Sequence, residues 1–140
     1  MKIPEGWYFH PMFVHFPQGL FPVALASFAV YVATGAEPLE TGAYVAAAFG
    51  ALAAPFTAIT GLLDWKIRYK GYMTSVFRIK IVGAFVLIAL SVAAVLLRAY
   101  VPGVAALPLS GAGYAYAGLL VACAATCVVL GHYGGKLVFH

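Results

Sequence analysis

Four histidines are the residues of this chain with the clearest capacity for chemistry, and they lie in two groups near opposite ends of the sequence. His10 and His15 belong to the segment HPMFVHFP, whereas His132 and His140 belong to the terminal segment GHYGGKLVFH. Neutral imidazole is the commonest metal ligand and a standard axial ligand of haem iron. Ionisable residues are also costly inside a bilayer, so histidines in spanning segments usually have a partner or a function. The two groups can form one site only if the fold brings them together.

The composition indicates a membrane protein. Of the 140 residues, 64% are hydrophobic and 9% are charged, whereas soluble domains average about 25% charged residues. Apolar runs of about 20 residues predict membrane-spanning helices. We therefore predict an all-α fold, a transmembrane four-helix bundle that forms a single domain over residues 1–140. The predicted spans are about 13–34, 42–63, 74–97 and 113–133.

Prolines and glycines set the predicted boundaries of these spans. The first helix begins near Pro11 or near Pro17, and the sequence does not decide between them. The segment 35–41, which carries Glu37 and Pro38 as well as Glu40, is predicted to be a loop. The fourth span is predicted to continue into a glycine-broken tail.

The distribution of basic residues predicts how the bundle is oriented. Five of them flank the connection between the second and third spans: Lys66, Arg68, Lys70, Arg78 and Lys80. With four spans, Lys2 and Lys136 fall on this same side. Cytoplasmic loops carry an excess of Lys and Arg, so both termini are predicted to be cytoplasmic. The net charge of +4 thus reflects topology and does not indicate a nucleic-acid partner.

The same topology places both histidine groups at the cytoplasmic end of the bundle. Helix bundles build cofactor sites from side chains on facing helices, so we hypothesise one or two b-type haems with bis-histidine ligation. The predicted ligands of the haem iron are His10, His15, His132 and His140. The spacings fit two ligand pairs, or one pair with two bystanders, and we favour His15 with His132 and His10 with His140.

Neighbouring residues fit this hypothesis but also have simpler explanations. Arg78 and Lys80 are predicted to meet the haem propionates, although ordinary interfacial anchoring explains either residue alone. Asp64 either orients a histidine or accepts a proton from a quinol, or it pairs at the helix end with Lys66, Arg68 or Arg78. Cys123 and Cys127 are four residues apart, and small-residue helix packing explains this spacing better than a redox or metal role.

Glycines near this end also favour a flat cofactor, because a porphyrin face needs bare backbone beside it. The glycines at the relevant levels are Gly19, Gly61, Gly131, Gly134 and Gly135.

The segments HPMFVHFPQGLFP, TGLLDW and GHYGGKLVFH together resemble a family of small four-span bacterial inner-membrane proteins that is catalogued as a domain of unknown function. Its hallmarks are HPxxVHFP and a GxxDW helix end, and the resemblance covers essentially the whole chain. The family's histidines correspond to His10, His15 and His140, whereas many members have another residue at position 132. The association of members with Rieske-type domains and cytochromes implies electron transfer.

We therefore predict a membrane-embedded b-type haem electron-transfer protein or redox-complex subunit, with an electron-transfer role favoured over a catalytic one. The alternative is a cofactor-free accessory or assembly subunit of a larger membrane complex. The lipid bilayer is the first predicted partner, and the further candidates are a quinone, other redox subunits or further copies of the chain. No nucleophile–base pair, P-loop or carboxylate pair indicates hydrolytic catalysis.

Overall fold

Four helices make up the described part of the protein. The computed structural model describes the backbone of residues 9–68 and 70–138, and the side chains of residues 16–67 and 70–133. The helices are α1 (Phe9–Thr34), α2 (Glu37–Arg68), α3 (Ser75–Tyr100) and α4 (Gly111–Val138). All four are long and apolar enough to cross a membrane. The shortest have 26 residues, and at about 1.5 Å per residue they exceed the roughly 30 Å hydrocarbon core of a bilayer.

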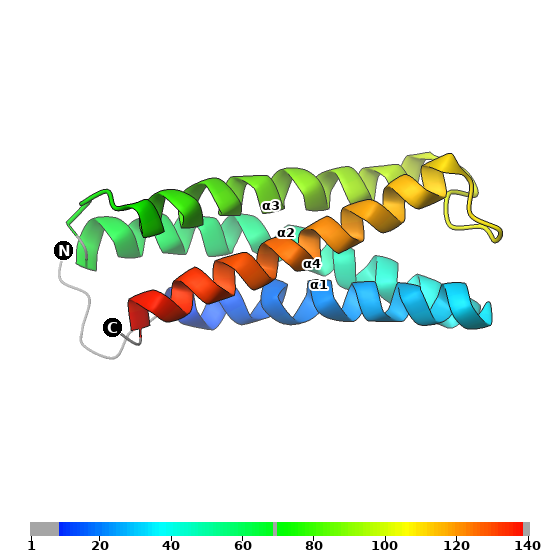
Figure 1. Cartoon of the computed structure of the whole chain (residues 1–140), viewed down its shortest axis with the longest axis horizontal. Helices are drawn as coiled ribbons and strands as arrows, with labels where there is room; N and C mark the ends of the chain where they lie inside the picture. The colour runs from blue at the N-terminus through cyan, green and yellow to red at the C-terminus, as the bar shows by residue number, and fades with distance from the viewer. Residues whose placement is uncertain (1–8, 69, 139–140) are drawn as a thin grey trace.

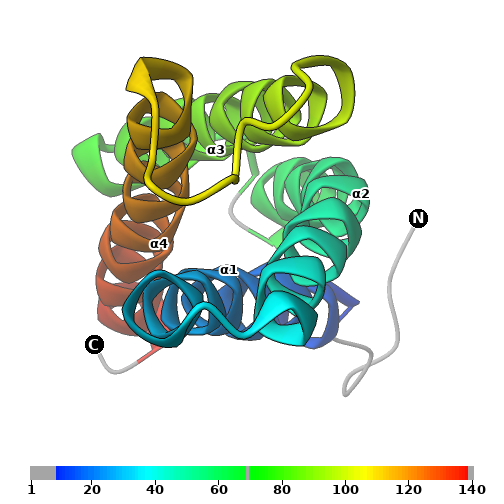
Figure 2. The ribbon, with the colours of Figure 1, turned by 90° about the vertical axis from the view of Figure 1, so that its right-hand side faces the viewer.

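The helices form an antiparallel bundle in which chain neighbours pack side by side and α4 returns to α1 (Figures 1 and 2). The first turns of α1 and the last turns of α4 lie at the end of the bundle where α2 turns into α3 (Figure 1). We call this the turn end. The opposite end carries the α1–α2 link and the long α3–α4 loop, and we call it the loop end. The all-α, four-span architecture predicted from composition is thus confirmed.

The link between α1 and α2 is shorter than the sequence suggested. Only residues 35 and 36 lie outside helices, and Gly35 has a positive φ of 73°. The predicted loop over residues 35–41 is therefore wrong, because α2 already begins at Glu37. Proline is tolerated in the first helical turn, where its missing N–H has no intrahelical partner, and acidic residues there favour the helix dipole. Pro38 and Glu40 therefore start the helix and do not interrupt it.

Two further boundaries also differ from simple proline and glycine rules. α1 begins at Phe9 and contains Pro17 and Pro22 within the helix. α4 remains helical to Val138, through the glycines that were predicted to break it. Glycine and proline are more frequent in membrane helices than in soluble ones, because backbone groups without a water partner remain in the helical pattern.

The core of the bundle is built from aromatic rings of α1 and small residues of α2. Phe21 is 1% exposed, and a Cβ placed on Gly50 would lie 2.8 Å from the end of its ring. Ala46 and Ala54 lie one turn on either side of Gly50 and are also buried. These small residues at four-residue spacing therefore let α1 and α2 approach closely.

The α3–α4 loop folds back over the loop end of the bundle. Val104 and Ala105 are buried although they lie in a loop, and the Tyr31 hydroxyl donates a 2.6 Å hydrogen bond to the Ala105 carbonyl. α4 begins close beneath this loop, since a Cβ on Gly113 would lie 2.6 Å from the Val104 carbonyl oxygen. The loop therefore closes the core at this end.

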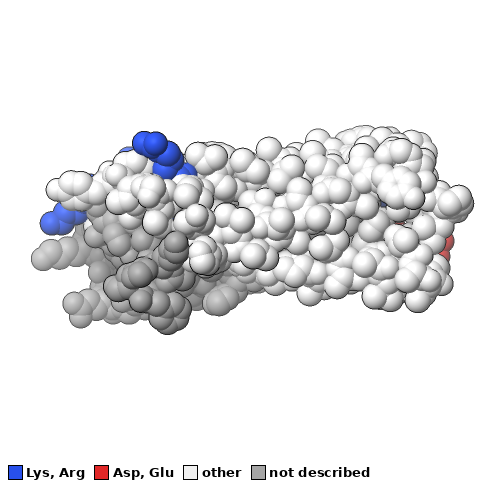
Figure 3. Space-filling model, in the orientation of Figure 1, with Lys and Arg blue, Asp and Glu red and all other residues white. Residues whose placement is uncertain are grey.

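The outer surface of the bundle is apolar along most of its length. On α2, Phe49, Leu52 and Phe56 are each more than half exposed, and Figure 3 shows charged side chains only towards the two ends of the visible face. A water-soluble protein rarely exposes contiguous apolar surface on this scale. The surface therefore fits contact with lipid.

Candidate functional site

The start of α1 and the end of α4 are held together by polar contacts near the predicted histidine site. The Gln18 side chain donates a hydrogen bond from Nε2 to the Cys127 carbonyl, at 2.8 Å. The Cys127 thiol contacts the Pro17 carbonyl oxygen at 3.5 Å. A Cβ on Gly131 would lie 3.3 Å from Gln18 Oε1, so Gln18 packs directly against the bare backbone of α4.

These contacts show where the histidines lie along the helices. His10 and His15 are in the first turns of α1, and His15 precedes Gln18 by three residues. His132 follows Gly131 directly in α4. The helices therefore bring these positions to one end of the bundle, as the four-span topology predicted. The side chains of His10 and His15, and the whole of His140, lie outside the described residues, so the ligand pairing stays a prediction.

The side chain of His132 faces away from the bundle core. It is exposed and continues the outward-facing stripe of α4 through Tyr114, Val121 and Val128, at helical spacing. Its ring makes an edge-to-face contact with Tyr133 at a centroid distance of 5.3 Å. An iron bound to this side chain would therefore lie at the outer surface of α4 and not between the four helices.

Gly19 and Gly131 are the described glycines that bear on whether a porphyrin fits between α1 and α4. The bare face of Gly131 is already covered by Gln18, whereas a Cβ on Gly19 would meet nothing within 4 Å. A porphyrin does not fit between α1 and α4 at the level of Gln18 and Gly131. A haem between these two helices would therefore have to lie beyond this level, towards the helix ends that carry the histidines.

The basic residues predicted to meet propionates lie in the first two turns of α3. Arg78 is exposed and Lys80 is half-buried, with the carboxylate of Asp64 near enough to act electrostatically on the Lys80 ammonium. The sequence predicted other basic partners for Asp64 and did not single out Lys80. Figure 3 shows the basic side chains at the turn end of the bundle.

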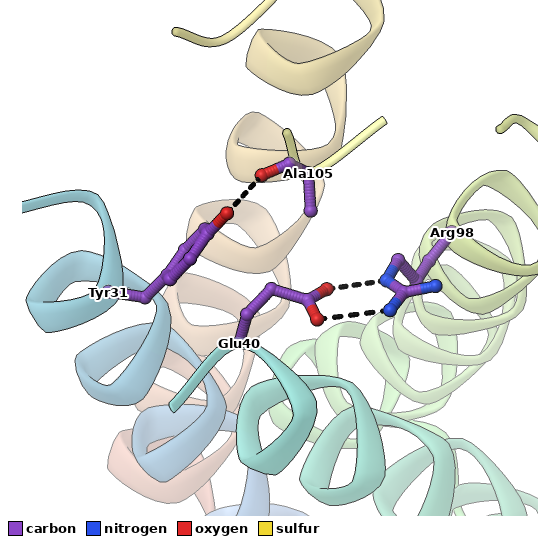
Figure 4. A network of polar contacts seen from close by, with 4 residues as sticks. All are labelled: Tyr31, Glu40, Arg98 and Ala105. Atoms are coloured by element: carbon purple, nitrogen blue, oxygen red, sulfur yellow. Dashed lines mark hydrogen bonds and ion pairs between the residues drawn. The ribbon is translucent and has the colours of Figure 1, made fainter. Parts of the chain in front are cut away.

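A second polar cluster lies at the loop end, where no site was predicted (Figure 4). Arg98 donates two hydrogen bonds to the Glu40 carboxylate, from Nε at 2.5 Å and from Nη2 at 3.0 Å. The Glu40 side chain is 8% exposed and that of Arg98 is 31% exposed. The Arg98 guanidinium also lies 4.8 Å from the centre of the Tyr44 ring. This cluster joins the start of α2 to the end of α3.

Tyr116 adds a buried hydroxyl near the same cluster. Its ring is fully buried and contacts Phe28 edge to face, at a centroid distance of 5.2 Å. Within the part of the chain that the structure describes, its hydroxyl has no hydrogen-bond partner. A buried hydroxyl without a partner destabilises the fold, so the Tyr116 hydroxyl is expected to lower the free energy of unfolding.

A family model described as "Predicted membrane protein (DUF2231)" matches residues 6–140. The chain belongs to the DUF2231 family. The match includes both histidine segments, and it agrees with the resemblance to a small membrane family of unknown function. Comparisons with curated proteins and with solved structures found no match.

The two cysteines of this DUF2231 protein lie inside the core. Cys123 and Cys127 are both fully buried and unoxidised, and they pack with Phe21, Ala54 and Leu87. This environment agrees with the packing role that their spacing favoured. Among the described side chains, no group of three or more His, Cys, Asp or Glu residues is close enough to hold a metal ion, and three of the four histidines are outside that set.

Sequence reasoning missed two polar features of this DUF2231 protein. Gln18 carries the only side-chain amide of the chain, and an amide inside an apolar span is itself a signal for an interhelical hydrogen bond. Glu40 and Arg98 fall at the same end of a four-span bundle, so the topology alone could have suggested that they pair.

Proposed function

We infer that this protein is a membrane-embedded b-type haem electron-transfer protein or a subunit of a redox complex. The observation that carries the proposal is the contact of Gln18 with Cys127 and Gly131, which joins the start of α1 to the end of α4. His15 and His132 lie within about one helical turn of this contact along their helices. Two histidine-bearing segments from opposite ends of the chain thus meet in space.

In this proposal the residues of the chain divide into ligands and charge partners. The ligand candidates for the haem iron are His10, His15, His132 and His140. The haem would supply one-electron redox chemistry, and the protein would supply axial imidazoles and an apolar surround. Arg78 and Lys80 would neutralise the propionates from the turn end. Quinone or another redox subunit would be the electron partner.

The outward face of His132 restricts how it takes part. Its side chain can bind a haem at the outer surface of α4, in contact with lipid, another subunit or a second copy of the chain. The other three histidines are then the candidates for a haem at the ends of α1 and α4. The favoured pair of His15 with His132 would therefore require a haem at the outer surface of α4.

The proposal also includes the orientation of the bundle. Four described basic side chains, Lys66, Lys70, Arg78 and Lys80, lie at the turn end, whereas the loop end has one, Arg98, together with Glu37 and Glu40. By the positive-inside rule, the turn end would face the bacterial cytoplasm, and both termini would be on that side of the inner membrane.

Visible spectroscopy tests the haem proposal directly. The protein should be purified in mild detergent from cells with an ample haem supply, and spectra recorded after oxidation and after dithionite reduction. We expect a b-type spectrum that is lost in His15→Ala or His140→Ala. Phe16→Ala is the matched control, because it truncates the neighbouring residue, which is 57% exposed and points away from the core. Folded but colourless wild-type protein would contradict the proposal.

A cofactor-free accessory or assembly subunit is the second candidate function. Two observations favour it, namely the outward-facing His132 and the Gln18 side chain packed over Gly131. The first directs the His132 side chain away from the α1–α4 contact, and the second fills that contact with the Gln18 side chain. In this case the wild-type protein should co-purify with a larger membrane complex and stay colourless. The Gln18→Ala variant should then weaken the bundle without a spectral effect.

A further inference from the structure

We propose that the turn between α2 and α3 is a binding site for the headgroup of an anionic phospholipid, with Lys66, Lys70 and Arg78 as its cationic contacts. Lys66 and Lys70 are available to a headgroup with or without haem, whereas Arg78 would contact a propionate in the haem-bound protein and a headgroup in a cofactor-free one. The proposal rests on three features of the turn end: a fixed turn, an excess of positive charge, and apolar stripes that continue from the cations along both helices.

The turn is held by contacts of Trp65 at the end of α2. The Trp65 carbonyl accepts a hydrogen bond from the Gly71 amide at 3.1 Å, and its indole Nε1 donates to the Tyr72 carbonyl at 2.8 Å. Lys70 and Gly71 both adopt positive φ angles, of 54° and 74°, which reverse the chain. Lys70 is therefore presented from a fixed turn and not from a flexible linker.

The cations of this turn have little opposing charge. Lys66, Lys70 and Arg78 are exposed, whereas Asp64 is half-buried and acts on Lys80. Of the acidic side chains that the structure describes, only Asp64 lies at the turn end, and Figure 3 shows the basic side chains standing out there. Clusters of Lys and Arg beside membrane helices attract anionic headgroups. The N-terminus of α3 lies in the same turn and adds a favourable dipole for phosphate.

Each helix continues from its cation into a lipid-facing apolar stripe. On α2, exposed Leu63 and Ile59 precede Lys66 in the chain at helical spacing. On α3, exposed Val82 and Phe85 come after Arg78 at helical spacing, so each stripe runs from its cation towards the middle of the bundle. A phospholipid has this same order of groups, with a charged headgroup above apolar chains. Acyl chains along either stripe would therefore bring a phosphate to the level of the cations. Free phosphate would lack the contribution of the stripes.

Native mass spectrometry of the full-length protein in neutral detergent can test this site. Phosphatidylglycerol and phosphatidylcholine of matched chain length would be added, with inorganic phosphate as a third arm. We expect phosphatidylglycerol to bind preferentially. A cation near a membrane surface contributes about fivefold to affinity, so the Lys66→Gln/Lys70→Gln/Arg78→Gln variant should lose roughly a hundredfold in affinity for phosphatidylglycerol. Phosphate alone should not compete at equal concentration.

Single substitutions keep the test valid if the triple variant does not fold. Lys70→Gln should weaken phosphatidylglycerol binding severalfold because it removes the positive charge, whereas Lys70→Arg keeps the charge and should preserve binding. The two variants are matched, because both place an unbranched side chain at the same positive φ. Equal binding of the two lipids would overturn the proposal. Unchanged phosphatidylglycerol binding in the folded Lys70→Gln and Lys66→Gln variants would also overturn it, as would full competition by inorganic phosphate.

Discussion

The ion pair between Glu40 and Arg98 is a polar contact between two helices of the bundle. It is bidentate and joins α2 to α3 at the loop end. The carboxylate is more deeply buried than the guanidinium, at 8% against 31% exposure. Removing one partner of a buried pair is costly because the other charge is left uncompensated. The two single substitutions should therefore have unequal effects.

We predict that Arg98→Gln is more destabilising than Glu40→Gln, because it leaves the more deeply buried charge unpaired. The expected losses in the free energy of unfolding are about 3 and about 1 kcal/mol, since the exposure of Arg98 reduces the second. Denaturant titration of both variants and of the double variant in detergent would measure the coupling. Additive losses would show that the two side chains do not interact.

The buried hydroxyl of Tyr116 leads to a prediction of the opposite sign. It has no hydrogen-bond partner among the described residues, so Tyr116→Phe removes an unsatisfied polar group and keeps the ring contact with Phe28. The variant should be more stable than the wild type by about 1 kcal/mol. Tyr31→Phe is the control, because it removes a hydroxyl that is bonded to Ala105 and should destabilise. A loss of stability in Tyr116→Phe would indicate a bound partner such as a buried water.

The roles of some residues could be predicted from the sequence, but several of their contacts could not. The packing role of Cys123 and Cys127 followed from their helical spacing. By contrast, spacing within one helix cannot show which residue of another helix lies opposite. The contact of Gln18 with Cys127 and the outward direction of His132 depend on how α1 and α4 cross, and only the fold fixes that crossing.

At the scale of elements, membrane helices differ from the rules that hold in water. Pro38 lies in the first turn of α2, where a loop was predicted, and α4 continues past Gly131 to Val138. In lipid, a broken helix leaves backbone groups without partners, and this cost outweighs the weak helix propensity of glycine. The existence and number of the helices were therefore predictable, and their ends were not.

Two glycines of α4 give a matched test of these elements. A Cβ on Gly113 would lie 2.6 Å from the Val104 carbonyl oxygen, whereas a Cβ on Gly118 would meet nothing within 4 Å. Gly113→Ala should therefore displace the α3–α4 loop and destabilise the protein by roughly 1–3 kcal/mol. Gly118→Ala should be neutral or slightly stabilising, because alanine has the higher helix propensity. Thermal unfolding in detergent measures both variants, and equal effects would contradict the close loop packing.

At the scale of the whole molecule, four spans explain why distant segments meet. An even number of spans returns the end of α4 to the start of α1, and this consequence was predictable by counting apolar runs. The precise arrangement of the histidines was not predictable, since it depends on helix rotation. The prolines of α1 do not break the helix, but helical continuity does not by itself give the ligand pairs.

The proposed orientation gives a prediction at this scale. Reporter fusions after residue 140 should report a cytoplasmic location, because four of the five described basic side chains lie at the turn end. A reporter inserted in the α3–α4 loop, near Gly103, should report the periplasm. The opposite pattern would reverse the sides of the membrane but would leave the bundle unchanged.

The ratio of haem to protein is the most direct test of the central claim. Haem extracted from purified wild-type protein, from haem-replete cells, should be quantified against the protein concentration obtained by amino-acid analysis. The proposal predicts one or two haems per chain in the wild type and a loss in His15→Ala, while far-UV circular dichroism stays unchanged. A folded wild-type protein that contains no haem would contradict it.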